Sequence, residues 1–134
     1  MPFALYASRD YVALNRPEHW IFIAYDAQFA DMPQQQWLLE IAGRRAAECE
    51  LSDIGSHLVA ARAGVGVAGL PCFLDDEEPG LMQLEHEGAM LSRDIWLVVH
   101  RDLRLSALVR AVMDFVAKVV AEEPGLGLEV SART

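Results

Sequence analysis

Short apolar runs alternate with helix-like segments along nearly the whole chain, and this order constrains the fold more than any other feature. The predicted strands are apolar or alternate apolar and acidic residues, and they cover 3–7, 20–26, 46–52, 66–70, 81–85 and 94–100. The predicted helices carry apolar residues at helical spacing, and they cover 9–14, 33–42, 54–63 and 105–122. This alternation predicts an α/β fold, a three-layer sandwich with helices on both faces of a sheet.

The composition limits the protein to a few classes. The 134 residues fit one domain with a real core, and 53% of them are hydrophobic. The apolar runs are shorter than the roughly 18 residues of a membrane span, and the start "MPFALYASRD" lacks the features of a signal peptide. We therefore expect a cytoplasmic protein that makes no membrane contact.

Charge and cysteine content exclude further classes of site. The chain has 11 basic and 20 acidic residues, and no cluster of Lys and Arg that would bind a nucleic acid backbone. Cys49 and Cys72 are the only cysteines, lie far apart and lack the spacing of a metal site. We interpret both as small buried hydrophobic residues and expect neither a metal nor a cofactor.

The stretch "AGVGVAGLP" (63–71) concentrates glycine where a helix should return into a strand. Gly64 suits the left-handed end of the helix, Gly66 lets the strand pack close beneath it, and Gly69 leaves room at the next turn. Pro71 then prevents the strand from continuing. In open α/β sheets such strand ends border the crevice in which ligands bind.

Several stretches also carry a family resemblance. The segments "AGVGVAGLPCFL" (63–74), "IWLVVHRDLR" (95–104) and "SALVRAVMDFVAKVV" (106–120) resemble the C-terminal half of the effector-sensing domain of LysR-type transcription regulators. The earlier pieces "LYASRDYVA", "IAYD" and "PQQQWLLE" follow in the order of the same family. The resemblance therefore covers essentially the whole chain, with a shortened connection between Asn15 and Trp20.

The resemblance implies a fold and a function. Residues 1–134 would be a partial effector-binding domain of the type 2 periplasmic-binding-protein class, with 8–92 as its second lobe. Residues 3–7 and 94–122 would be crossover strands and the C-terminal helix of the first lobe. A small-molecule effector would bind between two lobes without chemistry. Contact with DNA would require a winged helix-turn-helix that this chain does not contain.

The turn Ser52, Asp53, Ile54 and Gly55 matches the strand-to-helix turn that family members point at the effector. The first amides of a helix lack internal partners and carry partial positive charge, so a hydroxyl beside them makes an anion site. The alternative is that Ser52 or Asp53 only caps its own helix. The negative charge of Asp53 counts against a carboxylate effector.

Leu70, Pro71, Cys72 and Phe73 should supply apolar and aromatic walls to the same crevice, or else form a buried turn. A second hypothesis is an enzyme with no cofactor, in which Cys72 acts with His100 and Asp102. A lone Cys in an apolar run is far more often a packing residue, so we expect no catalytic residues.

The last predicted helix carries an apolar face that the chain itself does not obviously cover. That face could be core, a membrane-surface face, or a contact for an absent lobe, and its mixed polar charges argue against a membrane. Exposed apolar patches are commonly buried by association, so we expect a dimer or larger species. A third hypothesis, a free-standing small-molecule-binding protein, predicts a stable monomer instead.

Overall fold

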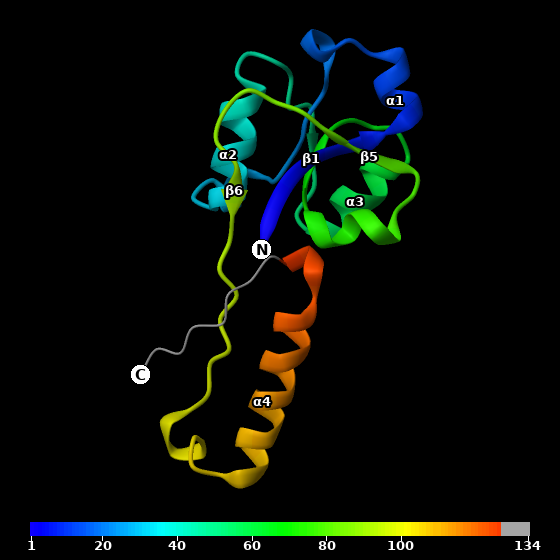
Figure 1. The fold of residues 1–134 in the computed structure, drawn as a ribbon. Helices are drawn as coiled ribbons and strands as arrows, with labels where there is room; N and C mark the ends of the chain where they lie inside the picture. Colours follow the sequence, from blue (N-terminus) through cyan, green and yellow to red (C-terminus); the bar gives the residue numbers. More distant parts are fainter. Residues whose placement is uncertain (127–134) are drawn as a thin grey trace.

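Strand β1 (Pro2–Ser8) is the centre of the fold (Figure 1). The structure is a computed structural model that describes residues 1–126, except the side chains of 75–77. On one side β1 pairs antiparallel with β4 (Ala68–Pro71), and on the other with β5 (Leu81–Leu84) and β6 (Leu91–Ser92). The strand at the middle of the sheet therefore comes first in the described chain.

Both faces of β1 are buried, which explains why its sequence is continuously apolar. Phe3, Leu5 and Ala7 point to one side and pack with Tyr11, Trp37 and Leu38 from two helices. Ala4 and Tyr6 point to the other side and pack with the helical residues Ala60 and Ala61. Successive side chains of a strand alternate between faces, so the two clusters form on opposite sides. The chain is thus mixed α/β, with helices against both faces of β1.

Two shorter strands extend this arrangement. Strand β2 (Ile23–Ala24) pairs parallel with β3 (Cys49–Glu50), and an isolated parallel bridge joins Phe22 to Val67 just before β4. The amide of Ile23 donates to the Val67 carbonyl at 2.8 Å, and the Val67 amide donates to the Ile21 carbonyl at 2.8 Å. β2 therefore lies between β3 and β4, and all three run in the same direction. The strands predicted at 20–26 and 46–52 are longer than those observed.

The first three helices begin and end at the residues that the sequence indicates. They are α1 (Arg9–Leu14), α2 (Pro33–Ala42) and α3 (Ile54–Arg62). Ser8 accepts a hydrogen bond from the Tyr11 amide, and Gly43 and Gly64 follow α2 and α3 with φ of 59° and 81°. Only glycine adopts such backbone angles without strain, so the predicted helix ends are confirmed.

The glycine-rich return has a different packing from the one expected. A Cβ on Gly66 would lie 2.4 Å from the Ile21 carbonyl oxygen, so this glycine allows contact with the segment before β2 and not with a helix. A Cβ on Gly69 would lie 2.8 Å from the Trp37 ring of α2. Close approach of backbone and ring is therefore the reason for both glycines.

Residues 93–126 form an arm that projects from the body of the fold (Figure 1). An extended segment leads to a 3-10 turn at Arg101–Leu103, and α4 (Ala107–Glu122) returns toward the body. Ser106 caps α4, so this helix begins at Ala107 and not at the predicted residue 105. None of the residues of α4 is buried, and Leu108 and Phe115 are 75% and 67% exposed. The last described turn, Pro124–Leu126, contacts the turn Cys72–Glu77.

The predicted strand at 94–100 is wrong for this structure, because these residues have no regular secondary structure. A strand needs a neighbour that receives its amide and carbonyl groups, and the described part of the chain pairs no strand with this segment. The apolar residues that led to this prediction are exposed: Val98 is 84% and Trp96 60% exposed.

Among the described residues, no helix is long and apolar enough to cross a membrane.

Candidate functional site

The ends of β2, β3 and β4 define one edge of the sheet. Because the three strands run in the same direction, Tyr25, Leu51 and Cys72, which follow them, lie at the same edge. Helix α3 begins at this edge, directly after the turn that follows β3. We call the residues Tyr25, 51–55 and 72–73 the carboxyl edge. The turns at 51–55 and 70–73 therefore share an edge, although β2 separates their strands.

The predicted turn residues Ser52, Asp53, Ile54 and Gly55 are all exposed at the carboxyl edge. Asp53 is the N-cap of α3: it accepts from the Ser56 amide at 2.9 Å and from the Ser56 hydroxyl at 2.6 Å. These hydrogen bonds from Ser56 lower the pKa of Asp53 and keep the carboxylate ionised. Asp53 therefore caps its helix and also leaves a fixed negative charge at the edge.

The four predicted wall residues divide into buried and half-buried positions. Leu70 is fully buried and packs in the cluster with α3, and Pro71 is buried beside it in β4. Cys72 and Phe73 are half-buried, and a Cβ on Gly125 would lie 2.9 Å from the Phe73 Cβ. The structure thus places Leu70 and Pro71 beneath the carboxyl edge, while the turn after α4 lies against Phe73.

Sequence reasoning missed a ring stack at the same edge. His57 is 1% exposed, and its ring lies 4.2 Å from the ring of Tyr25, centroid to centroid. His57 Nε2 lies 2.8 Å from the Leu51 carbonyl oxygen, which can only accept, so Nε2 carries the proton. The Nδ1 atom is buried without a hydrogen-bond partner among the described residues. Neither ring belongs to the two core clusters.

A buried glutamine fixes the backbone of this stack. Gln35 accepts from the Tyr25 amide at 2.9 Å and donates to the Tyr25 carbonyl oxygen at 2.9 Å. The sequence did indicate that Gln35 is buried, because it lies three residues before Leu38 and seven before Ala42, on the same face of α2. The end of β2 is therefore held by a side chain from α2.

Burial and local charge shift the pKa values of both rings. Burial lowers the pKa of His57, although the Leu51 carbonyl and the Asp53 charge oppose it. Burial raises the pKa of Tyr25, a hydrogen bond with the Gln34 side chain lowers it, and the Asp53 charge raises it. Both rings are thus neutral near pH 7 and offer polar atoms without charge.

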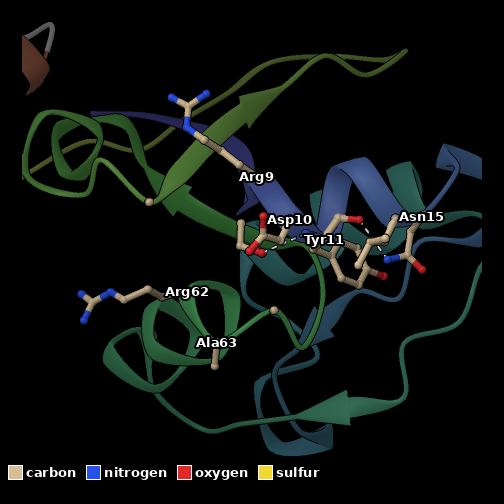
Figure 2. A pocket seen from close by; sticks show the side chains of 10 residues that line it. Arg9, Asp10, Tyr11, Asn15, Arg62 and Ala63 are labelled. Atoms are coloured by element: carbon tan, nitrogen blue, oxygen red, sulfur yellow. Dashed lines mark hydrogen bonds between the residues drawn. The ribbon is translucent and has the colours of Figure 1, made fainter.

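A hollow of about 640 Å³ lies at the opposite edge, between the start of α1 and the end of α3 (Figure 2). Several of its polar side chains have partners: Arg62 pairs with Glu78, and the Arg9 side chain donates to the Pro79 carbonyl. The Tyr11 hydroxyl accepts from the Ile21 amide at 2.8 Å. These side chains hold the fold together, and the exposed Asp10 also lines the hollow.

The family model described as the LysR substrate binding domain matches residues 1–121. This chain belongs to that family. No curated protein matches it.

The LysR substrate-binding domain is a regulatory, non-enzymatic domain family of transcription regulators. The residues of the alternative catalytic hypothesis lie in different elements. His100 lies at the turn Arg101–Leu103 in the arm, where its Nδ1 accepts from the Asp102 amide at 3.1 Å, whereas Cys72 follows β4 in the body. Among the described residues, no group of three His, Cys, Asp or Glu side chains could hold a metal ion.

Proposed function

We propose that this chain senses a small-molecule effector for a LysR-type transcription regulator, and that the effector binds at the carboxyl edge. The observation that carries the proposal is the convergence of three parallel strand ends and the start of α3 at one edge. The Ser52 hydroxyl and the start of α3 would contact the effector, and the buried Tyr25–His57 stack would lie beneath it. Exposed Ile54 and half-buried Cys72 would add apolar contact.

The charge of the edge narrows the class of effector. Asp53 is ionised and exposed. Two further carboxylates lie near the same edge: Asp26 comes shortly after β2, and Glu50 is the last residue of β3. A carboxylate effector would meet repulsion here, whereas a neutral or cationic molecule would not. We therefore expect a neutral or cationic effector.

A two-lobed domain explains the exposed arm. In the proposal, 8–92 are the second lobe of a three-layer, periplasmic-binding-protein-like domain, and 3–7 and 94–122 connect it to and complete the first lobe. The support is that 94–122 is apolar and largely exposed, as expected of a segment whose packing partner lies elsewhere. The regulator would act in the cytoplasm, associate with itself, and reach DNA through a winged helix-turn-helix.

The test is to map small molecules onto the chain by two-dimensional amide NMR. Probes are benzylamine, benzamide and benzoate. The proposal expects shifts from benzylamine or benzamide at 52–55 and 72–73, reduced by Ser52→Ala and unchanged by Ser92→Ala, an exposed serine on β6. Shifts centred on Arg9, Tyr11 and Arg62 at the opposite hollow would contradict it.

A further inference from the structure

The His57 ring contacts two different elements at the carboxyl edge. Its Nε2–H donates to the Leu51 carbonyl oxygen at 2.8 Å, and its face lies 4.2 Å from the Tyr25 ring, with 31° between the two planes. Leu51 begins the turn that leads into α3, whereas Tyr25 follows β2. One side chain of α3 therefore joins the turn 51–53 to the end of β2.

The surroundings of the second ring nitrogen suit only a neutral ring. Nδ1 is buried and has no hydrogen-bond partner among the described residues. In a neutral ring this atom is an acceptor, but protonation would make it a donor that needs a partner and would bring a charge into the interior. His57 is 1% exposed, so water does not solvate that charge where the ring lies. Protonation therefore destabilises the observed arrangement.

The two partners of the ring are not fixed equally by their other contacts. The backbone amide and carbonyl of Tyr25 are both held by Gln35. The Leu51 amide donates to the Ala24 carbonyl oxygen at 2.9 Å, and among the described residues the hydrogen bond to the Leu51 carbonyl comes from His57. If the His57 ring moves away, the Leu51 carbonyl and the Tyr25 ring lose a contact while the strand ends stay in place.

From these contacts we propose that His57 is a proton-sensitive switch at the carboxyl edge: the neutral ring holds the turn 51–53 to the Tyr25 ring, and the protonated ring leaves its place and releases both. The inference rests on the proposed function only in assigning an effector to this edge. Ser52 and Asp53 lie in the released turn, so protonation changes the surface that would meet the effector.

The groups around His57 set the pH range of this switch. The charged and titratable residues of the surrounding elements are Tyr6 on β1, Tyr25 and Asp26 after β2, Cys49 and Glu50 on β3, Cys72 after β4, Asp53 at the turn and Arg62 on α3 itself. The Asp53 carboxylate favours the protonated ring, but burial outweighs it and lowers the pKa of His57. The neutral arrangement is therefore favoured above the unfolded pKa near 6.5 and loses stability as the pH falls from there through the folded pKa.

The experiment follows the whole chain without ligand by NMR, from about pH 7.5 to about pH 5. Long-range proton–nitrogen spectra of the histidine rings report the tautomer and the protonation of His57. The Ser52 amide shares a peptide group with the Leu51 carbonyl and reports its hydrogen bond, and the Tyr25 ring protons report the stack. We expect the proton on Nε2 at the higher pH, and all three signals to change at one midpoint below 6.5.

A matched pair of variants assigns the change to His57. His57→Gln keeps a side-chain donor but does not titrate, so the acid-induced changes at Ser52 and Tyr25 should disappear. His19→Gln replaces an exposed histidine of the turn Pro17–His19 and should leave these changes as they are. Their persistence in His57→Gln would contradict the proposal. If that variant folds poorly, the wild-type midpoints decide, because their comparison needs no substitution.

Three results in the wild-type chain would overturn the proposal. The first is protonation of His57 with unchanged signals from Ser52 and Tyr25, and the second is a His57 midpoint at or above 6.5. The third is loss of the Leu5 amide signal at the same midpoint, since Leu5 lies on the central strand and its loss would mean unfolding of the whole chain. No effector is present in these measurements, so an effector that binds elsewhere would refute the proposed function and not this switch.

Discussion

Replacing Gln35 by Leu should destabilise the chain because it strands two buried backbone groups at the end of β2. Gln35 is 6% exposed, and its amide satisfies both the amide and the carbonyl of Tyr25 at 2.9 Å. A buried polar group without a partner costs about 1 to 3 kcal/mol. With two such groups, and some gain from the apolar Leu side chain, we expect a loss of about 2 to 4 kcal/mol.

The loss is measured by urea denaturation followed by far-ultraviolet circular dichroism. For a chain of this size about 3 °C of melting temperature corresponds to 1 kcal/mol, so a parallel thermal scan should fall by about 6 to 12 °C. The matched control is Gln36→Leu, one position along α2 and exposed, which should change stability by less than about 0.5 kcal/mol. Equal effects of the two substitutions would refute the assignment of Gln35 as the clamp on Tyr25.

Three further predictions test other parts of the structure. Gly66→Ala should lower the free energy of unfolding by about 2 kcal/mol or more, because the new Cβ would lie 2.4 Å from the Ile21 carbonyl oxygen. The control in the same denaturation assay is Gly80→Ala, whose Cβ would have no atom within 4 Å. The pKa of His57 is lowered in the folded chain, so its contribution to stability is complete above the unfolded pKa near 6.5 and is lost as the pH falls from there through the folded pKa. His57→Gln should therefore flatten the plot of unfolding free energy against pH in this range. An unaltered plot would contradict the burial of the ring. Phe115→Lys should reduce the mass observed by sedimentation if α4 mediates the proposed self-association, whereas a wild-type monomer would rule that association out.

The limits of sequence reasoning are visible at the carboxyl edge. The N-cap role of Asp53 was accessible from its position before α3, because capping depends on residues that are neighbours in the chain. The stack of His57 on Tyr25 was not, since the two residues come from different elements and meet only when α3 packs beside β2. Gln35 lies between these cases: helical spacing indicates its buried face, but not the backbone that it pairs with.

The amino-acid sequence determined the features that depend on local chemistry: the boundaries of the first three helices, the positive φ of Gly43 and Gly64, the apolar strand at the centre and the family resemblance. Only the tertiary structure decided which strands pair, that Leu70 lies in the core, and that 94–100 is not a strand. The physical reason is that a strand is stabilised by a neighbour's hydrogen bonds, and a side chain is buried by elements distant in the sequence. The local sequence pattern shows which segments can form strands and which side chains can be buried. The packing of the whole chain decides which of them are.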